Sequence, residues 1–214
     1  MYGSGVTTGL CVDFGYSTTK IMPIFEGGLQ ISEYIEKSLQ ERELLQAVNV
    51  PEDIENIKKE CYITQNCAMP KTKYEVKYKI TNGEEIDVTN EVFMAAEMLF
   101  QPNLVKEEGA EFMSLQDATV MAALKCDDEL RLELYDAIVP CGGLSLIPGL
   151  NERLECEMTN IVNQSVSILS SPEPYTVTWL GGAVFAGLSD TEKLFILKSQ
   201  FEDQGEKIVK NKFM

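Results

Sequence analysis

Apolar residues along this chain recur with two spacings, one typical of strands and the other typical of helices. Strict alternation over 74–81, the turn dipeptide Asn82-Gly83 and a return over 85–88 predict a β-hairpin. Further strands are predicted over 8–13, 18–24, 137–139 and 166–169. Helical spacing predicts helices over 29–46, 51–61, 118–125, 128–135, 151–162, 179–188 and 191–199. The run Ser114-Leu115-Gln116-Asp117 predicts a capping box at the start of the helix over 118–125. From Gln200 onward the chain is polar, which predicts an exposed tail.

Two of the predicted strands end in turns that a ligand could approach. Val139 is followed by Gly142-Gly143, and Pro148-Gly149 then opens a helix, so bare backbone N–H groups would face a ligand. A purely structural turn fits these glycines as well. The strand over 8–13 ends on Asp13, and Gly15 lies in the tight turn after it. Such a loop either brings a carboxylate and N–H groups to a hydrated cation and phosphate or is a plain hairpin.

Charge and composition narrow the classes of function. The 214 residues include 34 acidic and 18 basic side chains, for a net charge of −16. This balance argues against direct binding to nucleic acid or to an anionic membrane surface. The chain has no histidine. That removes the usual general base near neutral pH and every Ser-His or Cys-His catalytic pair.

The cysteines and the apolar stretches bear on the cellular compartment. The six cysteines form no CxxC motif, so their spacing supports neither a zinc site nor a redox motif. Several lie in apolar runs, which suits buried thiols in a reducing compartment. No apolar stretch is long enough for a membrane span, and residues 1–5 lack the features of a signal peptide. We therefore expect a cytoplasmic or nuclear location. The cysteines are Cys11, Cys61, Cys67, Cys126, Cys141 and Cys156.

Several motifs together give the chain a family resemblance. They occur at 2–15, 22–27, 99–102 (Leu-Phe-Gln-Pro), 125–135, 141–149, 179–182 (Trp-Leu-Gly-Gly) and 208–209. In this order they resemble the C-terminal half of actins, and the resemblance covers essentially the whole chain. It implies an α/β fold: a ribonuclease-H-like half of the actin fold with an inserted small α+β lobe. The implied large subdomain comprises 1–27 plus 103–174, the inserted lobe 28–102, and the C-terminal helices 175–214.

The resemblance also implies a nucleotide site. By position, the residues expected at ATP or ADP with Mg²⁺ are Asp13, Gly15, Lys58, Gly142, Gly143 and Leu146. Asp13 matches the carboxylate that holds the metal through water, so the resemblance makes it the metal residue. On the adenosine side the two glycines are kept, and Leu146 stands in place of a methionine.

Five nearby positions depart from the family. Tyr16 replaces an aspartate, Ser17 a glycine, and Lys20 the histidine beside the catalytic water. Ile147 replaces a tyrosine and Tyr175 a lysine. The first phosphate loop and the water-positioning glutamine of actins also have no counterpart here, and losing one positioned donor costs roughly 10²–10³ in rate. We therefore expect no ATPase activity, no catalytic residue, and nucleotide binding that is weak or lost.

The resemblance further implies a cleft that accepts amphipathic helices of regulatory proteins. The residues on cleft-lining positions are Tyr2, Thr7, Phe185, Leu188 and Leu194. The same residues could instead form local core. The expected function is that of an actin-like cytoskeletal or interaction protein, with actin, actin-binding proteins or an actin-related assembly as partners. The alternatives are an ATP-binding filament subunit of which this chain is a fragment or isoform, and a phosphotransferase of the wider superfamily.

Overall fold

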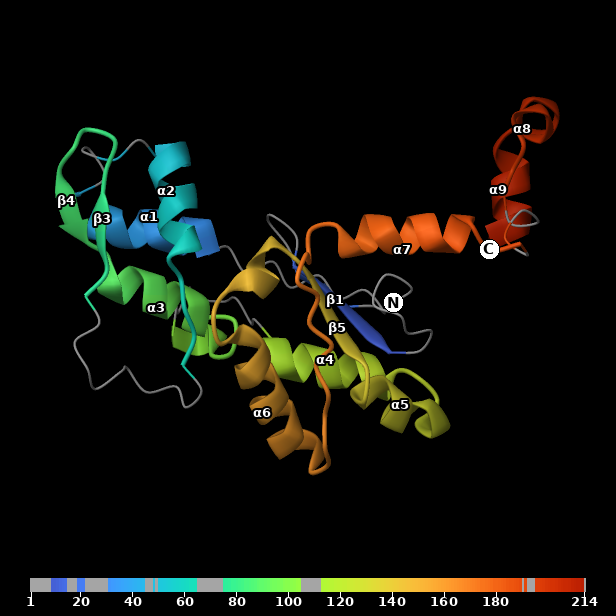
Figure 1. Ribbon diagram of the computed structural model, residues 1–214, viewed down its shortest axis with the longest axis horizontal. Coiled ribbons are helices and arrows are strands. Elements are labelled where there is room, and N and C mark those ends of the chain that lie inside the picture. The colour runs from blue at the N-terminus through green and yellow to red at the C-terminus, as the bar shows by residue number, and fades with distance from the viewer. Residues whose placement is uncertain are drawn as a thin grey trace.

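The structure is a computed structural model of the whole chain. It describes residues 9–14, 19–21, 31–44, 48, 50–64, 75–104, 113–189, 191 and 195–213, and the statements below concern these residues. The described elements are spread along an elongated molecule, with a small sheet near its middle (Figure 1).

The central sheet has three strands in the order β2-β1-β5. Strands β1 (Leu10–Phe14) and β2 (Thr19–Ile21) form the predicted N-terminal hairpin and are antiparallel. Strand β5 (Ile138–Gly142) lies parallel to β1 on its other side. The predicted strand over 166–169 is reduced to a single bridge from Ile168 to Ile138.

Helices α4 (Leu115–Leu124), α5 (Arg131–Tyr135) and α6 (Leu150–Val162) pack beside this sheet. Short 3-10 turns, η4 (Asp128–Leu130) and η5 (Gly143–Leu146), precede α5 and follow β5. The predicted cap of α4 is present, because the Ser114 hydroxyl oxygen accepts the N–H of Asp117 at 3.2 Å. Buried Leu10, Val12 and Ile138 belong to the same core cluster as Leu115 and Leu154.

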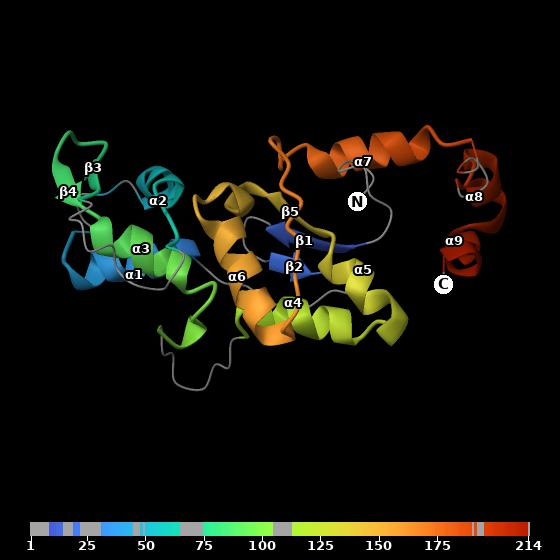
Figure 2. The ribbon, with the colours of Figure 1, turned by 60° about the horizontal axis from the view of Figure 1, so that its bottom comes forward.

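A second group of elements packs together at one end of the molecule (Figures 1 and 2). It contains α1 (Ile31–Glu41), α2 (Val50–Lys59), α3 (Thr89–Glu97) and the hairpin of β3 (Lys77–Lys79) with β4 (Glu85–Asp87). Helix α1 contacts both α2 and α3, and the 3-10 turn η3 (Pro102–Leu104) follows α3. The hairpin has the predicted turn, with Gly83 at φ 93°.

A buried ion pair joins this group to α6. The guanidinium of Arg153, which is 1% exposed, donates to both carboxylate oxygens of Glu97 on α3 at 2.9 and 3.2 Å. It also donates to the carbonyl of Thr64 at 2.9 Å and lies 4.9 Å from the centre of the Phe100 ring. The charge of Arg153 is therefore held by contacts with α3, with Thr64 and with the Phe100 ring.

The C-terminal helices α7 (Val177–Ala186), α8 (Lys198–Gln204) and α9 (Glu206–Phe213) extend toward the other end of the molecule (Figure 1). One expectation for this region was wrong. Residues 195–197 are not helical, so the predicted helix over 191–199 gives way to one that begins at Lys198. The tail after Gln200 is exposed at most positions, as predicted, but it is helical to Phe213.

Candidate functional site

The two candidate ligand turns of the sequence lie side by side. In the β1–β5 pair, Asp13 stands opposite Cys141 and Phe14 stands opposite Gly142. Because β1 and β5 are parallel, their carboxyl ends lie at the same end of the sheet. Ligands approach sheets of this kind at that end. Of Asp13 the backbone is described, and Gly15 lies outside the described residues.

The backbone polar groups of Gly142 are already engaged within the protein. Gly142 has φ 86°, a left-handed conformation that glycine adopts without steric cost. Its N–H donates to the carbonyl of Pro174 at 3.1 Å, and its carbonyl accepts the hydroxyl of Ser145 at 2.7 Å. The N–H that a phosphate or ribose oxygen would need is therefore bonded to the segment that leads into α7.

The ring of Tyr175 lies against the second glycine of the turn. A Cβ atom added to Gly143 would stand 3.2 Å from Tyr175 Cε1 and 3.7 Å from its hydroxyl oxygen. The carbonyl of Pro174 accepts the Gly142 N–H, which places the backbone just before Tyr175 beside the turn. Tyr175 is 68% exposed, so its ring forms the surface that a ligand approaching Gly143 would meet.

The turn at Pro148-Gly149 serves a structural purpose. Gly149 has φ 84°, and a Cβ atom at this position would stand 2.1 Å from the carbonyl oxygen of Ile63. The N–H of Ile63 donates to the carbonyl of Pro148 at 2.9 Å. The residues after α2 are thus pressed onto the start of α6, which leaves no room for any other side chain at 149.

The remaining predicted nucleotide residues have the following surroundings. Lys58 on α2 is largely buried, and its ammonium group donates to Ser32 at 3.2 Å and lies 3.5 Å from Glu55. The charged partner, Glu55, lies on the same helix, and the hydroxyl partner lies on α1. Leu146 is the last residue of η5, which begins at Gly143, and its side chain is 48% exposed.

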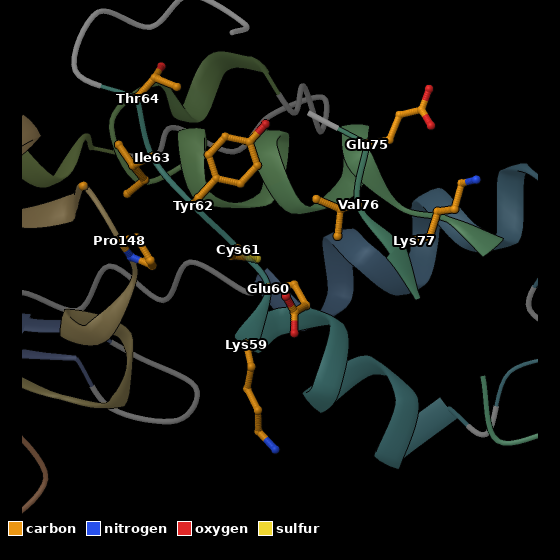
Figure 3. A pocket seen from close by; sticks show the side chains of 11 residues that line it. Lys59, Glu60, Cys61, Tyr62, Ile63, Thr64, Glu75, Val76, Lys77 and Pro148 are labelled. Carbon is orange, nitrogen blue, oxygen red and sulfur yellow. The ribbon is translucent and has the colours of Figure 1, made fainter. Parts of the chain in front are cut away.

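A cavity of about 630 Å³ lies between the residues that follow α2, those that lead into β3, and the Pro148-Gly149 turn (Figure 3). Lys59 points away from its centre and donates to Asn56 at 2.8 Å. Burial raises the pKa of the Cys61 thiol to about 12, so this thiol is protonated at neutral pH and is a poor nucleophile. No motif in the sequence predicts this cavity.

The predicted partner cleft is described in part. Phe185 is half-buried and Leu188 is 44% exposed, whereas Tyr2, Thr7 and Leu194 lie outside the described residues. Much of the apolar surface of α7 faces outward, and Trp179 is 75% exposed. Helix α7 therefore presents an apolar face that the described part of the chain leaves uncovered.

Two further features concern metals and membranes. Within the described ranges, no three His, Cys, Asp or Glu side chains are grouped so that they could hold a metal ion together. None of the described helices has both the length and the apolar character that crossing a bilayer requires.

Comparison with known proteins gives a consistent result. The family model described as Actin matches residues 31–214. Actin-like protein 7A of Macaca fascicularis is 28% identical over 226 residues, which cover 96% of this chain and 51% of that protein. Actin-like protein 7A of Bos taurus is 28% identical over 230 residues, covering 96% and 50%. The human protein of the same name is 28% identical over 226 residues, covering 96% and 51%. The chain thus spans about half the length of the curated relatives it matches.

Proposed function

This chain belongs to the actin family, and on that premise we propose that it is an actin-like interaction protein whose adenosine-side turn does not hold ATP productively. Its function would be to bind actin, actin-binding proteins or an actin-related assembly in the cytoskeleton. Cytoplasm is the proposed location, with the nucleus as a second compartment.

The position of Tyr175 is the observation that carries this proposal. Its ring lies against Gly143, and the neighbouring Pro174 takes the Gly142 N–H. A nucleotide that used this turn would have to displace the ring and break that hydrogen bond. The residues at the turn therefore do not fit ATP in the arrangement that they have.

Catalysis of phosphoryl transfer depends on positioning and on electrostatic stabilisation, with little covalent chemistry by the protein. Tyr16 and Lys20 stand where the family has an aspartate and a histidine. A charged lysine is a poor proton acceptor, and a tyrosine supplies no negative charge to hold a hydrated cation. These residues support a role that does not include ATP hydrolysis.

The proposed division into subdomains follows the family fold. The large subdomain would comprise 1–27 plus 103–174, the inserted lobe 28–102, and the C-terminal helices 175–214. Packing of α1, α2 and α3 with the β3–β4 hairpin supports the second unit. The Arg153–Glu97 pair would then fix the inserted lobe to the large subdomain.

The exposed apolar surface of α7 supports a protein partner. Phe185 and Leu188, together with Tyr2, Thr7 and Leu194, would line the groove for an amphipathic helix. The net charge of −16 supports partners other than nucleic acid or an anionic membrane.

Binding of a fluorescent ATP analogue tests the role of Tyr175. The wild-type chain should give no saturable signal with Mg²⁺ present, and Tyr175→Ala should bind more strongly because the ring no longer covers Gly143. Stronger binding by the wild type than by Tyr175→Ala would show that the ring stacks on the base, and this would overturn the proposal.

Sedimentation with and without ATP tests the filament alternative, for which an ATP-dependent pellet is the expected result.

A further inference from the structure

Two cysteines far apart in the sequence meet on one face of the central sheet. Cys11 lies on β1 and Cys141 on β5, and their sulfur atoms are 3.6 Å apart. Cys11 is paired with Val139 and Asp13 with Cys141, so the two cysteines are diagonal neighbours on the same face. Both are reduced thiols.

The thiols open into a cavity of about 280 Å³ beneath α7. Val139 joins them on the sheet side, and Val177 and Phe185 are among the α7 residues that close the other side. The sheet and α7 lie next to each other in both overall views (Figures 1 and 2). A volume of this size is several times the share of one water molecule, roughly 30 Å³, so an ion fits without rearrangement of the sheet.

A disulfide between these residues would require the two sulfur atoms to move closer together. They are 3.6 Å apart, whereas the sulfur atoms of a disulfide are about 2.0 Å apart. A single atom placed between the sulfurs avoids this movement. Soft metal–thiolate bonds are about 2.3 Å long by the value for zinc, so two sulfurs up to about 4.6 Å apart can share one ion.

We propose that Cys11 and Cys141 form a two-thiolate site for one soft monovalent ion of the Cu(I) type. Thiolates are the ligands that Cu(I) prefers. A structural zinc ion would need four ligands, and within the described ranges no three His, Cys, Asp or Glu side chains are grouped so that they could hold a metal ion together. On binding, each thiol would release its proton to solvent and each sulfur would form one bond to the ion. No electron is transferred, so the ion remains Cu(I).

The site is independent of the proposed nucleotide chemistry, because it rests on the thiol pair and its cavity alone. Binding should release two protons, one from each thiol. The cavity is otherwise lined by three apolar side chains, two glycines and Thr178, which favours a weakly hydrated soft ion over a hydrated divalent one.

Competition with a chromogenic Cu(I) chelator, under anaerobic reducing conditions and with the full chain, tests the proposal. The wild type should take one equivalent of Cu(I) from the chelator, and Cys11→Ser and Cys141→Ser should each lose it. Cys156→Ser is the matched control, because Cys156 is a half-exposed thiol on α6, and it should retain the equivalent. Equal Cu(I) uptake by all four proteins would overturn the proposal.

Alkylation of the wild type needs no variant and so keeps the proposal testable if a substitution prevents folding. Bound Cu(I) should protect Cys11 and Cys141 from iodoacetamide, as read from peptide masses, while Cys156 reacts at an unchanged rate. Unchanged labelling of the pair after addition of Cu(I), or a Cys11–Cys141 disulfide in place of a metal complex, would contradict the two-thiolate site.

Discussion

At the scale of single residues, the surroundings of a charged side chain or a glycine determine how much stability a substitution there costs. Arg153 and Glu97 are each 1% exposed, and the second carboxylate partner of Arg153 is Glu157 at 2.6 Å. Gly149 and Gly83 share a positive φ but differ in surroundings. Substitutions at these residues can therefore be compared with substitutions at sites that differ mainly in burial or crowding.

Arg153→Met should destabilise the fold by about 3–5 kcal/mol, because Glu97 would remain buried without its counter-ion. Urea unfolding measures the loss. Addition of Glu97→Leu to the same variant should recover part of it, since the uncompensated charge is then removed. Lys198→Met is the control, because its ion pair with Glu202 is exposed and should contribute no more than about 1 kcal/mol. Similar losses for the two single variants would contradict the importance of the buried pair.

Gly149→Ala should cost more stability than Gly83→Ala. Both positions have positive φ, 84° and 93°, so both variants carry a backbone cost of about 1–2 kcal/mol. At Gly149 the new methyl group would also meet the Ile63 carbonyl at 2.1 Å, whereas at Gly83 nothing lies within 4 Å. Thermal unfolding of the two variants should therefore show a clearly larger loss for Gly149→Ala. Equal losses would mean that the contact with Ile63 is relieved at little cost.

At the scale of elements, hydrogen bonds hold the ends of helices and strands in register. Buried Asp53 on α2 accepts the hydroxyl groups of Tyr78 and Thr81, at 3.0 and 2.9 Å, and so ties this helix to the β3–β4 hairpin. Where β4 ends, Asp87 accepts the N–H and the hydroxyl of Thr89 at 2.9 and 2.6 Å. This pair of bonds organises the start of α3.

The contribution of Asp87 should depend on pH. Hydrogen bonds from Thr89 lower the pKa of the Asp87 carboxyl from its ordinary value of 3.8. Because the folded pKa lies below the unfolded one, the stabilisation is present above pH 3.8 and is lost as the pH falls through the folded pKa. The difference in urea midpoint between wild type and Asp87→Ala should therefore shrink on acidification.

Asn82→Ala is the matched control for this titration. The Asn82 amide oxygen accepts the N–H of Glu84 at 2.9 Å, a comparable exposed bond from a side chain that does not titrate. Its effect on the urea midpoint should not follow the carboxyl titration. If the difference in urea midpoint between wild type and Asp87→Ala stays the same at the lowest pH, the charge of Asp87 contributes nothing to stability.

Local patterns in the sequence predicted some elements and missed others for physical reasons. The β3–β4 hairpin and the cap of α4 depend on neighbouring residues, so alternation, Asn82-Gly83 and Ser114 were sufficient. Helix α3 was missed because it is buried on most sides and therefore has little polar–apolar periodicity. The Tyr175–Gly143 contact and the Cys11–Cys141 pair join distant segments, and no local pattern encodes such contacts.

At the scale of the whole molecule, α7 connects the central sheet to the outlying helices α8 and α9 (Figure 2). Trp179, the single tryptophan of the chain, is 75% exposed on this helix. Neighbouring Leu180 and Val184 are 44% and 43% exposed. Large exposed apolar surfaces of this kind mark sites of protein association.

The emission of Trp179 should report on this surface. In the isolated chain its maximum should lie at the wavelength of a solvent-exposed indole, and a neutral quencher should reach it freely. Addition of an actin-type partner that covers α7 should shift the maximum to shorter wavelength and reduce quenching. A short-wavelength maximum in the dilute, monomeric chain would contradict the exposure of this helix.

Tyr175 and Pro174 occupy the glycine turn that we propose to be the adenosine side of this actin-family chain. Calorimetric titration of Mg-ATP into the wild type and into Asp13→Ala tests it most directly. We predict heats equal to those of dilution for both proteins. Saturable binding by the wild type that is lost in Asp13→Ala would contradict the account, because it would show a working nucleotide site that includes the metal-facing carboxylate.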